Sequence, residues 1–175
     1  MSEKKAVLIG DRAKVLLEEI EKRRTEAKKQ GMNFTGLTDE EIYRKLTRKN
    51  SPMIVAQGWN SAAPGGTVNY TVSINNPDPV RHVWLFGHVF VGLAKVASDV
   101  SDAVSAVDTR FPRLTLPDFD GLSIDSGATK DLKFVISIPA NVERTNYLGN
   151  CFLFRATWHD PALYLDRGLF VFKVI

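Results

Sequence analysis

The sequence predicts a mainly β protein, an antiparallel β-sandwich of about seven strands preceded by two α-helices. Apolar residues keep helical spacing in the first fifty positions and then alternate along short runs bounded by turn residues. No connection of clear helical character joins these runs, which favours antiparallel pairing over a parallel sheet. We therefore expect a helical N-terminal segment, residues 1–50, packing on or extending from one sandwich domain, residues 51–175.

The first helix is expected over residues 11–30. Its apolar residues lie near helical spacing: Ala13, Leu16, Leu17, Ile20 and Ala27. Gly31 stands where a glycine commonly ends a helix. Because only the first half carries a convincing apolar stripe, the second half is expected to project into solvent or to need a partner.

The second helix has a sharper start signal. Thr38 and Glu41 form a capping box, in which each side chain bonds the other residue's backbone N–H. A narrow apolar face follows: Ile42, Tyr43 and Leu46. The run Asn50-Ser51-Pro52 ends the helix.

Strands are expected from Met53 onward. Met53–Gln57 is short and apolar, and the turn Ala63–Gly66 introduces the clearest alternation of the chain. Further alternating runs follow, and the last of them lies at the C-terminus. The residues expected to lie on shared strand faces are Val68, Tyr70, Val72 and Ile74, then Leu132, Phe134, Ile136 and Ile138, then Phe152, Phe154, Ala156 and Trp158, and finally Phe170, Phe172 and Val174.

The run Val83–Leu93 is apolar on both parities, so it must be covered on both faces. We expect the N-terminal helices to provide the second cover, the alternative being another subunit. Residues 95–120 fit two interpretations. Four valines spaced by four, four and three residues suit a helix, whereas their β-branching and the surrounding polar residues suit a loop or edge strand.

Short strands at this spacing are typical of an immunoglobulin-like sandwich. The segments Gly66–Pro77 and Gly127–Pro139 each combine a glycine turn, an alternating strand and a closing proline. In this they resemble bacterial and archaeal immunoglobulin-like modules, including the cell-adhesion-related kind. The resemblance covers about a third of residues 53–175, and it implies a non-catalytic spacer or binding unit.

Charge is unevenly distributed along the chain. Residues 1–50 hold thirteen Lys and Arg against nine Asp and Glu, whereas the remainder holds ten against eleven. Acidic and basic residues alternate in the N-terminal segment, which indicates a solvated helix face, so we do not expect a nucleic-acid partner. The composition, 44% hydrophobic with three Trp and ten Phe, excludes a disordered chain.

Cys151 is the only cysteine, so no internal disulfide can form. We expect no secretory signal and no membrane span, since the apolar runs are too short. Together these observations predict a cytoplasmic protein.

Metal and cofactor sites are not expected. His82 and His88 would lie about 20 Å apart on a straight strand, too far to share one ion. Asp118, Asp120 and Asp125 faintly resemble a calcium loop, but the closing glutamate is missing.

The most functional-looking segment lies near the C-terminus and joins two strands. It gathers an imidazole, two carboxylates, a guanidinium and two large aromatic rings within ten positions, in a loop where sandwich proteins commonly bind ligands. The candidate ligand or partner contacts are Trp158, His159, Asp160, Tyr164, Asp166 and Arg167. The alternative is that Asp166 and Arg167 pair on the surface while the aromatic residues complete the core.

No nucleophile motif or phosphate loop is present, so we expect no enzyme activity. The leading interpretation is a non-catalytic protein-interaction or structural module, with a protein partner or self-association. Two alternatives remain: a coat- or shell-like protein with a basic helical arm, and a small enzyme or ligand-binding protein that uses the Trp158–Arg167 loop.

Overall fold

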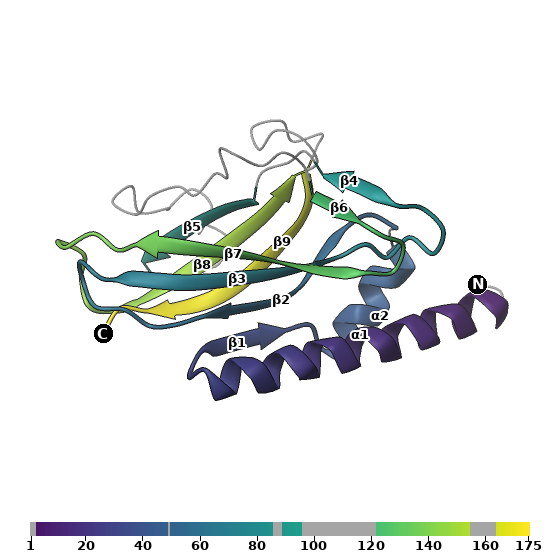
Figure 1. Ribbon diagram of the computed structural model, residues 1–175, viewed down its shortest axis with the longest axis horizontal. Helices are drawn as coiled ribbons and strands as arrows, with labels where there is room; N and C mark the ends of the chain where they lie inside the picture. Colours follow the sequence, from purple (N-terminus) through teal and green to yellow (C-terminus); the bar gives the residue numbers. More distant parts are fainter. Residues whose placement is uncertain (1–2, 49, 86–88, 96–121, 155–163) are drawn as a thin grey trace.

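The computed structural model describes residues 3–48, 50–85, 89–95, 122–154 and 164–175 (Figure 1). It is mainly β, with two helices and antiparallel sheets, as predicted. The elements in chain order are α1 (Glu3–Lys29), β1 (Asn33–Gly36), α2 (Asp39–Arg48), β2 (Met53–Trp59), β3 (Thr67–Asn75), β4 (Val83–Leu85), β5 (Val89–Lys95), β6 (Leu122–Ile124), β7 (Thr129–Ser137), β8 (Asn146–Phe154) and β9 (Tyr164–Lys173). They form a four-stranded sheet β1-β2-β3-β7, a three-stranded sheet β5-β8-β9 and the pair β4-β6.

The two larger sheets lie in separate layers and share one hydrophobic core (Figure 1). On β3 the core side chains are those of the predicted alternation, from Val68 to Ile74. The Trp59 and Tyr70 rings of the first sheet lie 4.8 and 5.2 Å from the Phe170 ring of the second. The period-two pattern therefore identified the inward faces of β3, β7 and β9 correctly.

The strand β8 differs from its prediction. It starts at Asn146, well before the predicted Phe152, and buries the other parity: Tyr147, Cys151 and Leu153. Ala156 and Trp158 lie outside the described residues, as does most of the ambiguous stretch, residues 96–120.

Both predicted helices are present. α1 begins eight residues earlier than expected and ends as predicted before Gly31, which has a φ of 67°. The capping box of α2 is confirmed, since the Glu41 N–H donates to Thr38 Oγ1 over 3.3 Å and Glu41 Oε1 accepts from the Thr38 N–H over 3.4 Å. Tyr43, predicted on the apolar face, is exposed.

The helices pack on β2. The two described side chains of the run Val83–Leu93, which was predicted to meet the helices, lie elsewhere: Val83 packs against the main core and Trp84 is exposed. Met53 and Val55 of β2 join a second cluster formed with side chains of both helices: Ala13, Leu16, Ile20, Ile42 and Leu46. The opposite face of β2 contributes Ile54 and Trp59 to the main core. β2 is therefore covered on both faces, and every one of its residues is buried.

A short strand, β1, was not predicted. It pairs antiparallel with β2, from Asn33 opposite Trp59 to Gly36 opposite Ala56, and forms one edge of the first sheet. Gly36 lies against α1, since an added Cβ would stand 2.5 Å from Ile20 Cγ2. The N-terminal segment therefore contributes a strand to the sheet as well as its cover.

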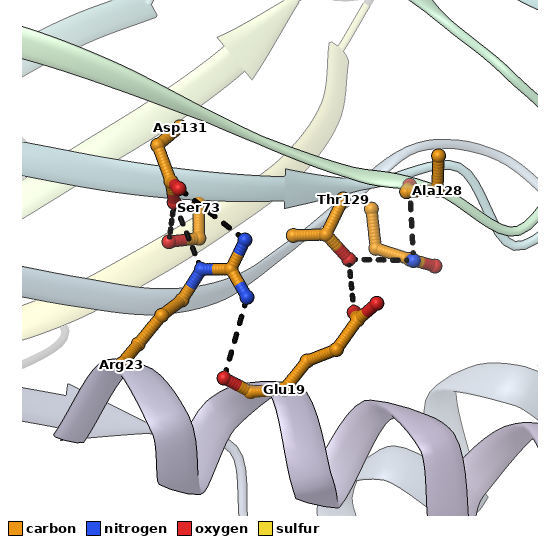
Figure 2. A network of polar contacts seen from close by, with 7 residues as sticks. Glu19, Arg23, Ser73, Ala128, Thr129 and Asp131 are labelled. Atoms are coloured by element: carbon orange, nitrogen blue, oxygen red, sulfur yellow. Dashed lines mark hydrogen bonds and ion pairs between the residues drawn. The ribbon is translucent and has the colours of Figure 1, made fainter. Parts of the chain in front are cut away.

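Polar contacts fix the second half of α1 over the outer face of the first sheet (Figure 2). The Arg23 guanidinium donates to both carboxylate oxygens of Asp131 on β7, over 2.9 and 3.3 Å. Thr129 Oγ1 donates to Glu19 Oε2 over 2.6 Å, and Ser73 Oγ of β3 also donates to Asp131. The weakly apolar half of the helix is thus held by charge-assisted hydrogen bonds.

Replacing Arg23 by alanine is expected to lower the free energy of unfolding by about 0.5–1 kcal/mol, because the pair is part-exposed and screened by solvent. Denaturant unfolding measures the change, which should shrink in 1 M salt. Lys22→Ala removes an equal charge from an exposed position of the same helix and serves as the control. Equal losses from both variants would contradict the assignment.

Candidate functional site

Three of the six predicted contact residues lie on β9: Tyr164, Asp166 and Arg167. The other three, Trp158, His159 and Asp160, lie outside the described residues. Among the ion pairs of the described residues, Asp166 pairs with Lys45 of α2 and not with Arg167. Adjacent residues of a strand point to opposite faces, which explains why the two side chains separate.

Asp166 connects three elements. Its carboxylate accepts from Lys45 Nζ of α2 over 2.8 and 3.0 Å, and from the backbone N–H of Ile54 on β2 over 2.7 Å. The register of β2 against β3 shifts between Ile54 and Ala56, which marks a β-bulge. Asp166 therefore satisfies a backbone donor beside the bulge and at the same time fixes the helix.

A cleft of about 360 Å³ opens beside this contact, between α2, β1, β2 and β9. Arg44 and Arg167 contribute guanidinium groups to its wall, whereas Glu41 contributes a carboxylate. Both arginines are exposed, so their charges are available to an anionic group of a ligand or partner. Asp166 also lines the cleft but is already occupied by Lys45 and Ile54.

The polar groups behind the cleft are buried and bonded to one another. Gln57, which also lines the cleft, accepts a hydrogen bond from the Tyr70 hydroxyl. Burial raises the pKa of Tyr70 well above its ordinary value and raises the pKa of Cys151 to about 12. A neutral, fully buried thiol is a poor nucleophile, so Cys151 acts as a small core residue.

The outward face of β9 carries a basic residue followed by two apolar ones, which we call the β9 face: Arg167, Leu169 and Val171. Leu169 is 36% exposed and Val171 is 56% exposed, while Phe170 and Phe172 between and beside them are buried. The inward positions of Phe170 and Phe172 follow the predicted alternation, whereas no role was predicted for the residues of the opposite parity.

The described residues hold no group of three or more His, Cys, Asp or Glu side chains that could bind a metal ion. His82 Nδ1 and Asp125 Oδ1 are hydrogen-bonded to each other, whereas His88, Asp118 and Asp120 lie outside the described ranges. Neither helix, as far as the structure describes it, is long and apolar enough to cross a membrane.

Several solved structures resemble this chain at low sequence identity. The C-terminal domain of Wzt superposes with a TM-score of 0.51 at 10% sequence identity, over 82% of this chain and 78% of that domain. Spo0M, a sporulation control protein from Bacillus subtilis, gives a TM-score of 0.43 at 11% identity, over 72% of this chain and 50% of that one. The ASH/PapD-like domain 7 of human CEP192 gives 0.30 at 12% identity, over 82% and 84%.

The likeness to the Wzt domain is one of fold alone, and it agrees with a sandwich-like arrangement of the sheets. No protein-family model and no curated protein matches the sequence. Function must therefore be argued from the surfaces of this chain.

Proposed function

We propose that the protein is an assembly module, an immunoglobulin-like sandwich of residues 51–175 with its helical segment, residues 1–50, packed on one sheet, and that it associates with a second copy through the β9 face. The observation that carries the proposal is the exposure of Leu169 and Val171 on one strand. Apolar side chains at consecutive outward positions of a sheet are typical of a face that is buried on association.

The location of the helices supports this choice of face. They cover the first sheet, where Met53 and Val55 are buried against them, and the β9 face belongs to the other sheet. Removing residues 1–50 would expose the apolar side of β2 and remove its pairing partner β1. Point substitutions on β9 therefore test assembly without unfolding the first sheet.

Charge on the same face predicts how the association responds to salt. Arg167 and Lys173 stand at the two ends of the apolar pair, and both are exposed. A two-fold arrangement with antiparallel β9 strands brings Arg167 of one copy close to Lys173 of the other, and this repulsion weakens as salt screens it. Association is therefore expected to strengthen from low to high salt, unlike association driven by opposite charges.

The test is the solution mass by light scattering during size exclusion. We expect a particle of about twice 19.5 kDa for the natural sequence, and a monomer after the double change Leu169→Lys with Val171→Lys. Val135→Lys is the matched control, since Val135 is 66% exposed but lies on β7 of the other sheet. A monomeric natural sequence in high salt, or a double variant of unchanged mass, would contradict the proposal.

Arg167 is the member of the predicted contact set that the β9 face includes. The complete set, Trp158, His159, Asp160, Tyr164, Asp166 and Arg167, remains a proposed partner contact, and its first three members lie outside the described residues. Its support is the position of Arg167, which lines the cleft beside Arg44 and borders Leu169. The Arg167→Ala variant separates the two contributions. It should weaken contact with an acidic partner, whereas self-association should not weaken, because the repulsion from Lys173 is removed and the two apolar side chains stay in place.

A further inference from the structure

A serine, a histidine and an aspartate form a hydrogen-bonded chain on the two-stranded sheet β4-β6, far in sequence from β9. Ser123 Oγ lies 2.6 Å from His82 Nε2, and His82 Nδ1 lies 2.9 Å from Asp125 Oδ1. The atoms that meet are those that a nucleophilic triad requires, because the carboxylate and the hydroxyl contact different nitrogens of one imidazole.

The pairing of the two strands produces this arrangement. Val83 pairs with Ile124 and Trp84 with Ser123, which brings His82, just before β4, next to Asp125, just after β6. Ser123 and Asp125 are two positions apart and share one face of the strand. The Trp84 ring lies 5.3 Å from the His82 ring, so an aromatic surface borders the chain of hydrogen bonds.

The hydrogen bonds also determine the imidazole tautomer. A carboxylate only accepts, so the Nδ1 proton of neutral His82 is donated to Asp125 and Nε2 is left with its lone pair. Nε2 then accepts the hydroxyl proton of Ser123. This is the tautomer in which histidine can act as a general base toward serine.

We propose that Ser123 is an activated nucleophile that accepts acyl groups from carboxylic esters, with His82 as its base and Asp125 as the positioning residue. Ser123 Oγ forms a bond to the carbonyl carbon while its proton passes to His82 Nε2. The bond from that carbon to the alcohol oxygen then breaks, and the alcohol leaves with the proton. Water hydrolyses the acyl-serine by the same two steps, so that ester and water become acid and alcohol.

This activity goes beyond assembly and would revise the expectation that the chain lacks a catalytic arrangement. The exposure of Asp125 and His82 to water limits the expected catalytic rate. The Asp125 side chain is 85% exposed and that of His82 is 38% exposed, so water screens the carboxylate and its main effect is to orient the ring. We therefore expect covalent capture of reactive acyl or phosphonyl donors to be easier to detect than rapid turnover.

The first test is labelling by a fluorophosphonate probe, read by intact mass and by peptide mapping. Oγ bonds to phosphorus, fluoride leaves and the hydroxyl proton passes through His82 to water. We expect one adduct per chain on Ser123, its absence in Ser123→Ala, and a labelling rate about 100-fold lower in His82→Ala. The Asp125→Ala variant should lose less than about tenfold, since water already screens the exposed carboxylate and alanine introduces no donor that would favour the other tautomer.

Ser126→Ala is the matched control, because the Ser126 hydroxyl donates to the backbone oxygen of Asp78 and does not belong to the chain of hydrogen bonds. Its labelling should equal that of the natural sequence. Labelling that persists in Ser123→Ala, or a rate unchanged in His82→Ala, would overturn the proposal. The three residues would then form a surface hydrogen-bond cluster with no catalytic role. Circular dichroism confirms that each variant is folded.

A second variant gives a readout independent of esters. In Ser123→Cys the imidazole should hold the introduced thiol as a thiolate, so that iodoacetamide alkylates it at about pH 6, where an ordinary thiol reacts slowly. The natural cysteine does not interfere, because Cys151 is fully buried. Adding His82→Ala should abolish the fast reaction, and a fast reaction that survives this change would overturn the role of His82.

Discussion

Replacing Phe170 by alanine is expected to lower the free energy of unfolding by about 3–5 kcal/mol. The ring is 5% exposed and contacts both Trp59 and Tyr70, so its removal leaves a cavity where the two sheets meet. Denaturant unfolding followed by tryptophan fluorescence measures the change. If the slope of the unfolding free energy against denaturant concentration stays unchanged, the loss of stability arises in the folded state.

A double-mutant cycle with Gly149 tests the same contact. A Cβ on Gly149 would stand 2.3 Å from two carbons of the Phe170 ring, so Gly149→Ala should cost about 1–3 kcal/mol by overpacking. In the Phe170→Ala background the clash disappears, and the added methyl should then be neutral or stabilising. Additive losses in the double variant would contradict the contact.

The sequence was a good guide where burial follows one simple period. The alternation from Val68 to Ile74 identified an inward strand face, and Thr38 with Glu41 identified the start of a helix. Both signals are local, because a strand face and a capping box are set by neighbours within a few residues. Gly31 belongs with them, since a left-handed residue ends the helix regardless of what the helix packs against.

The cover of the sheet could not be predicted in the same way. The chain contains two apolar runs, Val83–Leu93 and Met53–Gln57, and neither pattern indicates which of them contacts the helices. The choice depends on β1, a four-residue strand too short and too polar to predict, which places the helices next to β2. A long-range pairing therefore decided a question that the local pattern left open.

The candidate sites also divide into features that a local pattern indicates and features that depend on long-range pairing. Asp166 and Arg167 were found because the chain concentrates polar and aromatic residues near them, but the sequence suggested pairing between them, whereas Asp166 pairs with Lys45. Ser123 and His82 are 41 positions apart, and only the register of β4 against β6 brings them together. The carboxylate Asp125 was noted only as part of a calcium-like loop.

Asp166→Ala is expected to lower the free energy of unfolding by about 2–3 kcal/mol, the second large loss. Its side chain is 15% exposed and accepts from both Lys45 and the Ile54 N–H. The two donors do not contribute equally. Lys45 has a flexible stem and is 23% exposed, so its ammonium can turn to water when its partner is lost.

The Ile54 N–H has no such freedom, because Ile54 is buried beside a bulge and its donor belongs to the backbone. Three variants should therefore rank in a definite order. Asp166→Ala loses both contacts, Asp166→Asn keeps an acceptor for Ile54 and loses about 1 kcal/mol, and Lys45→Met loses less than that. Denaturant unfolding gives the order, and hydrogen exchange at the Ile54 amide should accelerate in Asp166→Ala but not in Lys45→Met. If Lys45→Met cost as much as Asp166→Ala, the ion pair to α2, and not the backbone contact to β2, would account for the contribution of Asp166.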